Sequence, residues 1–147
     1  MARRYKEGLL PFRIVPADEP LVARSGLLLP YEIAKALKLP EVIDRELPKP
    51  GSGRGYKPSQ FVIPIILMFH GGGRKLEELR EIRAEISLRE LLEMERVPAS
   101  CTIGDWLRRM GQNAEGLCGL GKVNHHLVSE VIKRDKRNNY TLDVDAS

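Results

Sequence analysis

Two carboxylates near the end of the sequence have the spacing of metal ligands. Asp143 and Asp145 lie two residues apart in 140–145, where alternating apolar residues predict a β-strand, so both project from one face. Carboxylate oxygens are the ligands that Mg²⁺ prefers. A two-metal phosphoryl-transfer site needs further carboxylates, and none follows in the sequence. The alternative interpretation is that both carboxylates cap a turn.

A second group of polar residues lies on one side of a helix predicted to begin at Thr102. Its buried side is predicted from apolar residues at helical spacing, namely Ile103, Trp106, Leu107 and Met110. A shorter predicted helix from Ser87 and a tight connection at 95–98 precede it, which gives a helix–turn–helix layout. Short polar groups and arginines near the outward side have the chemistry to contact DNA, and the candidates are Ser100, Thr102, Arg108 and Arg109.

Asp105 lies on the same outward side and opposes contact with DNA unless a nearby arginine pairs with it. An ordinary helical hairpin also carries arginine and aspartate on its solvated side. The pattern of residues alone favours this hairpin over a DNA-reading helix.

Basic residues also surround a linker at 48–57 that is rich in proline and glycine. Arg54 and Lys57 precede a helix predicted to begin at Pro58, with Lys57 in the cap position. Basic side chains and free N–H groups at a helix N-terminus favour an anion such as DNA phosphate. A flexible, solvated connection is the alternative. A later basic cluster could likewise either contact the DNA backbone or cap a helix C-terminus. Its members are Lys133, Arg134, Lys136 and Arg137.

The histidines and cysteines do not form a zinc signature. His125 and His126 are adjacent, so on a helix they point about 100° apart and cannot easily share one metal ion. Cys101 and Cys118 stand apart, without a CxxC pair. We therefore expect two free thiols and two histidines that belong to the surface or the core.

The elements that must position these groups are predicted to be mainly helical. After an N-terminal extended hairpin at 12–23, a helix begins at Tyr31 and is ended by Pro40, and a turn follows around Val42. Further helices are predicted at 58–70, from Leu76 through 86, from Ser87, from 102 to about 111, and from about 122 to 136. The last of these helices is expected to direct four apolar residues inward: Val123, Leu127, Val131 and Ile132. The fold class is thus a multi-helix bundle with one C-terminal strand.

The composition allows a modest core and a polyanionic partner. Hydrophobic residues make up 42% of the 147 residues, and the net charge is +4 with a pI near 9.2. The most apolar run, 61–69, is shorter than the roughly 20 residues of a membrane-spanning helix. No signal peptide is evident at the N-terminus. We expect a soluble, cytoplasmic protein.

The order of several motifs resembles that of bacterial insertion-sequence transposases of the DDE group-1 kind. The matching stretches are SGLLL (25–29), GYKPS (55–59), GGG (71–73), LEELR with IR (76–80, 82–83), VPASCTI (97–103), WLRR (106–109) and TLDVDAS (141–147). The chain departs from the family pattern at Lys57, Glu78, Glu85 and Ser147.

The resemblance implies a division of the chain into three parts. Residues 1–24 would be an N-terminal extended segment, 25–138 a helical DNA-binding domain, and 139–147 the first strand of an RNase H-like catalytic domain. In the family, the N-terminal region binds double-stranded DNA at the terminal inverted repeats of the element, and the full-length protein is a possible homodimer. Asp145 would be the first of three carboxylates that hold Mg²⁺.

The second Asp and the Glu of that family are missing, so the resemblance implies a truncated, catalytically incomplete transposase that retains at most DNA binding. Two other functions stay open. One is a free-standing helix–turn–helix regulator, and the other is a helical interaction module with no role in nucleic-acid binding.

Overall fold

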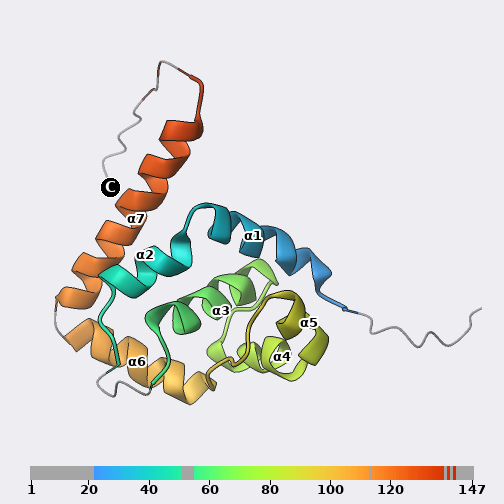
Figure 1. The fold of residues 1–147 in the computed structure, drawn as a ribbon. Helices are drawn as coiled ribbons and strands as arrows, with labels where there is room; N and C mark the ends of the chain where they lie inside the picture. The colour runs from blue at the N-terminus through green and yellow to red at the C-terminus, as the bar shows by residue number, and fades with distance from the viewer. Residues whose placement is uncertain (1–21, 51–54, 113, 138, 140, 142–147) are drawn as a thin grey trace, which may run out of the picture.

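The structure, a computed structural model, describes residues 22–50, 55–112, 114–137, 139 and 141. Within these ranges the chain is helical and contains no strand (Figure 1). The mainly helical fold class is therefore confirmed. The strand predicted at 140–145 lies outside the described residues apart from Thr141, and the hairpin predicted at 12–23 lies outside them apart from Val22 and Ala23.

The first two helices are joined by a tight turn at Lys38. A 3₁₀ turn, η1 (Ser25–Leu27), leads into α1 (Leu28–Ala36), and α2 (Leu39–Glu46) follows after Lys38, whose φ of 55° turns the chain. Pro40 stands in the first turn of α2, where its missing N–H costs no hydrogen bond. The prediction that Pro40 ends a helix and that a turn follows around Val42 is therefore wrong.

The central helix, α3 (Pro58–His70), matches the sequence prediction. Lys57 is its N-cap residue and Gly71 its C-cap residue. The helix continues through Pro64, which is buried together with Phe61 and Leu67. It contacts α1, α2 and α4 and therefore forms the middle of the core (Figure 1).

The helices that follow the glycines at 71–73 are shorter than predicted. A 3₁₀ turn η2 (Leu76–Glu78) continues into α4 (Leu79–Ala84), and α5 (Ile86–Leu91) begins after a break at Glu85. At this break the Glu85 carboxylate accepts a hydrogen bond from the amide of Ala23, 3.0 Å away. A continuous helix from Leu76 to Ile86 is therefore not formed.

Two longer helices complete the fold. α6 (Ser100–Gln112) begins two residues before the predicted Thr102 and extends one residue past Gly111. α7 (Glu115–Arg134) begins seven residues before the predicted start at 122. Its first turns pack closely on the end of α2, because a Cβ at Gly119 would lie 2.5 Å from the carbonyl oxygen of Glu46. No helix in the described ranges is both long and apolar enough to cross a membrane.

Candidate nucleic-acid interface

Two buried apolar residues fix the inner side of α6. Ile103 is fully buried, and Trp106, which is 3% exposed, stacks on Phe61 of α3 with ring centroids 4.8 Å apart. Met110 is partly buried against the core. These three predicted anchors are confirmed. Leu107 was predicted to be buried as well, but 41% of its surface is exposed, because α6 rotates it away from α3.

The outward side of α6 carries the polar groups that the sequence singled out. Arg108 and Arg109 are exposed, whereas Ser100 and Thr102 are half-buried in the first turn of α6. Asp105 forms an ion pair with Arg108, one helical turn further along. Asp105 is thus paired with a nearby arginine, which is the condition for this side of α6 to contact DNA. Because Asp105 neutralises part of the charge of Arg108, Arg109 is the less neutralised of the two arginines.

The connection between α5 and α6 is an ordered turn. The amide of Met94 donates to the carbonyl of Arg89 over 2.8 Å, and that of Glu93 to the carbonyl of Glu90 over 3.0 Å, which together make a Schellman motif. Glu93 takes the left-handed position of this motif, with a φ of 52°. The connection then buries Val97 and Pro98. α5 ends at Leu91 and α6 begins at Ser100, so the connection spans 92–99 and is longer than the tight connection predicted at 95–98.

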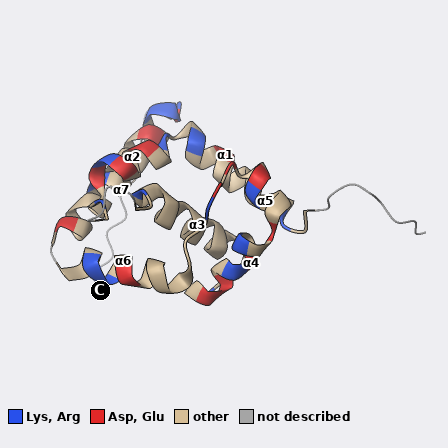
Figure 2. Ribbon diagram, turned by 60° about the horizontal axis from the view of Figure 1, so that its bottom comes forward, with Lys and Arg blue, Asp and Glu red and all other residues tan. Residues whose placement is uncertain are grey.

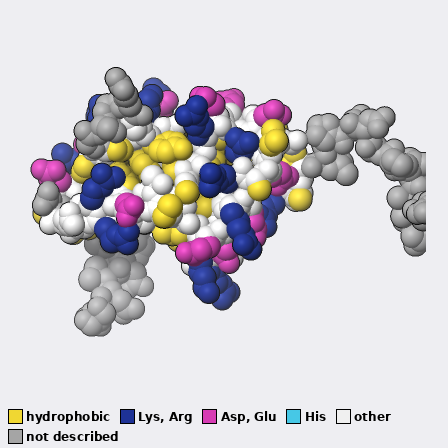
Figure 3. Space-filling view, turned by 90° about the horizontal axis from the view of Figure 1, so that it is seen from below, with side chains coloured by type: hydrophobic (Ala, Val, Ile, Leu, Met, Phe, Trp, Pro, Cys, Tyr) yellow, Lys and Arg dark blue, Asp and Glu magenta, His cyan; other side chains and the backbone are white. Residues whose placement is uncertain are grey.

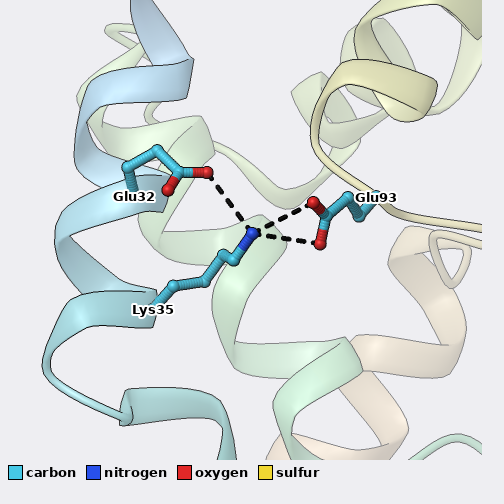
Figure 4. Close-up of polar contacts among 3 residues, drawn as sticks. All are labelled: Glu32, Lys35 and Glu93. Atoms are coloured by element: carbon cyan, nitrogen blue, oxygen red, sulfur yellow. Dashed lines mark hydrogen bonds and ion pairs between the residues drawn. The ribbon is translucent and has the colours of Figure 1, made fainter.

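An ion pair ties this turn to the N-terminal helices. Lys35 of α1 lies between Glu32 and Glu93, with its Nζ 3.4 Å and 3.0 Å from their carboxylates (Figure 4). The hydrogen bond to Glu93 is the main reason that the pKa of Lys35 is raised above 10.5. A second ion pair, between Arg24 and Glu81, joins the residue before η1 to α4.

Further basic residues lie beside α6. η2 packs against α6, and Arg74 and Lys75, both exposed, come directly before η2. The amides of these two residues donate to the carboxylate of Glu78, which lowers the pKa of Glu78 below 4.5. On the face seen from below, which includes α6, basic side chains lie among apolar and acidic ones (Figure 3), and the ribbon shows both kinds of charge along α4 and α6 (Figure 2).

The sequence pattern does not single out Arg74 and Lys75 as site residues. The only local signal is that two consecutive basic residues follow the three glycines at 71–73. Their closeness to α6 depends on how η2 packs, which the sequence pattern does not give.

A shallow groove of about 290 Å³ brings the linker and α6 together. Lys49, from the linker that follows α2, lines it together with Arg109 and Trp106 of α6. Glu115 at the start of α7 also lines the groove. The structure therefore places one linker cation with one α6 cation, although 60 residues separate them in the sequence.

The predicted phosphate site at the start of α3 has no free N–H groups in its first turn. The amide of Lys57 donates to the side chain of Gln60 at 2.8 Å, and that of Ser59 to Asp44 at 2.7 Å. The amide of Gln60 donates to the Lys57 carbonyl. Lys57 remains exposed, but Asp44 already supplies the negative charge that this helix end favours. Arg54 lies outside the described residues.

The histidines and cysteines do not come together. His126 of α7 is partly buried and forms a hydrogen bond with the carbonyl of Leu37 at 3.0 Å, while His125 is exposed. Cys101 and Cys118 are exposed free thiols. In the described ranges no group of three or more His, Cys, Asp or Glu side chains is arranged to hold a metal ion. Asp143 and Asp145 lie outside those ranges, so the described residues supply no ligand set for Mg²⁺.

The basic cluster at the end of α7 is engaged in local contacts. Lys133 pairs with Glu130 over 2.9 Å, and Arg134 donates to the carbonyl of Ala36, the last residue of α1, over 2.7 Å. Arg134 thus caps a helix C-terminus, but the helix is α1 rather than α7.

No protein-family model, no curated protein and no solved structure matches this chain.

Proposed function

We propose that this chain binds double-stranded DNA through α6, as the DNA-binding part of a DDE transposase. The observation that carries the proposal is the division of α6 into two sides. Ile103 and Trp106 fix one side in the core, while Arg108 and Arg109 stand exposed on the other, after an ordered turn from α5. This is the arrangement by which a recognition helix enters a major groove.

Gly104 adds support because nothing within the described chain explains it. A glycine in a helix interior costs about 1 kcal/mol relative to alanine. A Cβ at Gly104 would have no atom within 4 Å, so internal packing does not require the glycine. Its absence of a side chain leaves room for a partner to approach the backbone of α6 between Cys101 and Asp105.

The cations around α6 suit contacts with phosphates on either side of a groove. Arg109 and Lys49 share the groove at one end of α6, and Arg74 and Lys75 lie near η2, which packs on the same helix. Such contacts position a protein on the duplex but do not read its sequence. Sequence would be read by the shorter polar groups of α6, with Thr102 and Arg108 as the proposed residues.

The transposase assignment rests on the order of sequence motifs and reaches further than DNA binding. It assigns the terminal inverted repeats of a mobile element as the target and Asp145 as one Mg²⁺ ligand. A free-standing helix–turn–helix regulator would use the same face of α6 on a different target. The affinities for two duplexes distinguish the transposase fragment from the regulator. The transposase fragment should prefer a duplex with the inverted repeats that flank its coding sequence over a shuffled duplex, and the regulator should not.

Fluorescence anisotropy with both labelled duplexes tests the proposal. Replacing the two arginines (Arg108→Ala with Arg109→Ala) should weaken binding about tenfold or more, since such contacts contribute on the order of 1–3 kcal/mol. Lys38→Ala is the matched control, because it removes an exposed charge between α1 and α2, away from α6, and should leave the affinity unchanged (Figure 1).

Gly104→Ala separates binding from folding. The substitution should raise the free energy of unfolding by up to about 1 kcal/mol, because alanine favours the helix. It should nevertheless weaken DNA binding, because the new methyl group stands on the docking side. No affinity of the parent chain for either duplex, in low salt, would refute DNA binding and favour a helical interaction module.

A further inference from the structure

The outer side of α7 carries an apolar stripe that the described chain does not cover. We define the α7 stripe as Leu117, Leu120, Val128, Val131 and Ile132, together with Asn124 and Gly121. The five apolar side chains are between 47% and 74% exposed. The inward direction predicted for Val131 and Ile132 is therefore wrong. The residues that α7 buries are instead Gly116, Gly119 and Val123.

The stripe is a continuous band on one side of the helix. With 100° per residue, its members fall within an arc of about 120°, which is centred well away from the buried residues. Figure 1 shows that no other described helix lies over it, because α7 lies at the edge of the described elements, with α2 and α6 on its inner side. The stripe contains no Lys, Arg, Asp or Glu, so it is unsuited to DNA or to a charged peptide.

The stripe is symmetric about Asn124. Leu117 and Val131 lie seven residues on either side of it, and Leu120 and Val128 lie four residues on either side. If two copies of α7 run antiparallel around a two-fold axis at Asn124, Leu117 therefore meets Val131 and Leu120 meets Val128, whereas Ile132 falls opposite the buried Gly116. The two Asn124 side chains then meet each other, so the one polar side chain of the stripe finds a hydrogen-bonding partner.

We propose that a second copy of this chain covers the stripe, through antiparallel pairing of the two α7 helices. A two-fold interface is self-complementary, as the symmetry of the stripe requires. Gly121 lies on the same side of α7, and a Cβ at Gly121 would have no neighbour within 4 Å among the described residues. The glycine thus leaves space for a partner side chain.

Charge favours the antiparallel direction over the parallel one. The C-terminal end of α7 and the residues after it keep a net positive charge, because Glu130 and Asp135 pair locally with only part of this group of cations: Lys133, Arg134, Lys136 and Arg137. Parallel pairing would bring both basic ends together, and like charges repel. Antiparallel pairing separates the basic ends and places each near the N-terminal end of the other helix, which carries Glu115.

The size of the stripe is sufficient for a weak dimer. From their exposed fractions, the five apolar side chains present roughly 500 Å² on each copy, or about 1,000 Å² for a pair, which is near the lower limit of a specific interface. We therefore expect a dimer that dissociates on dilution. The proposal does not depend on DNA binding, and its test contains no DNA.

Sedimentation equilibrium of the full chain tests whether the dimer exists. At a concentration on the order of 100 µM the mass should approach twice 16.6 kDa and fall on dilution. Leu120→Lys and Val128→Lys should each give a monomer, because either places two buried charges in the interface. Leu107→Lys, on the exposed part of α6, is the control and should still dimerise. A parent chain that stays monomeric overturns the proposal.

Disulfide cross-linking tests the direction of pairing. In a chain with Cys101→Ser and Cys118→Ser, Asn124→Cys should form a cross-linked dimer, because the axis passes through that residue. Leu117→Cys alone should not, because antiparallel copies of residue 117 lie about 20 Å apart along the axis. Adding Val131→Cys to Leu117→Cys should restore the cross-link. A cross-link from Leu117→Cys alone would overturn the antiparallel arrangement.

Discussion

The helices α6 and α7 are attached to the same core in opposite ways. α6 inserts large side chains, Ile103 and Trp106, and leaves charged groups outside. α7 approaches through two glycines and Val123, and leaves leucines and valines outside. The difference indicates the kind of partner that each outer face suits. A polar, cationic face suits a hydrated anion such as DNA, whereas an uncharged apolar face suits another apolar surface.

The largest effect is expected from removing the anchor of α6. Trp106→Ala deletes a buried ring that stacks on Phe61 and should lower the free energy of unfolding by about 3–5 kcal/mol. Leu107→Ala, on the partly exposed side of the same helix, should cost less than about 1 kcal/mol. Urea denaturation measures both. Equal losses would show that α6 is not anchored on one side only.

The same substitution should have opposite signs in the two helices. Gly119→Ala places a Cβ 2.5 Å from the Glu46 carbonyl oxygen, so α7 must move away from α2, at a cost of about 1–3 kcal/mol. Gly104→Ala in α6 meets nothing and should stabilise the protein. Thermal unfolding of the two variants compares them directly, and a stabilising Gly119→Ala would contradict the close packing of α7.

A smaller effect isolates the turn that leads into α6. Glu93→Gly and Glu93→Ala both remove one of the two ion-pair partners of Lys35, but only glycine takes the left-handed conformation without strain. We expect the glycine variant to be about 1 kcal/mol more stable than the alanine variant. If chemical denaturation finds the alanine variant equally stable, the left-handed turn is not retained in solution.

The smallest effect concerns the support of α6 by η2. The amides of Arg74 and Lys75 hold the folded-state pKa of Glu78 below 4.5, so its ionised form stabilises the fold above that pH. This contribution is lost as the pH falls through the lowered value. The stability gap between the parent chain and Glu78→Gln should therefore shrink below pH 4.5. A gap that stays constant from about pH 3 to 7 would contradict the hydrogen bonds to Glu78.

The sequence predicted elements best where the local signals agree. For α3, Pro58 in the first turn and the glycines at 71–73 mark both ends. For α6, helical spacing identified Ile103 and Trp106. Pro40 misled because proline both ends a helix and begins one, and only the burial of Val42 and Ile43 decides between these roles.

Other features depend on contacts between distant segments, which periodicity does not encode. The break at Glu85 coincides with its hydrogen bond to Ala23, 62 residues earlier. The approach of Lys49 to Arg109 depends on the packing at the end of α6. For α7, the spacing showed that Val131 shares a side with apolar neighbours, but it did not show that this side faces away from the core.

The salt dependence of DNA binding tests the role of α6 most directly. Each phosphate contact contributes about one unit to the slope of log affinity against log salt concentration. Lys49→Ala combined with Arg109→Ala should reduce that slope by about two units, because both cations line the same groove beside α6. Lys38→Ala should leave it unchanged. An identical slope for all three proteins, or no salt-dependent binding at all, would contradict the account.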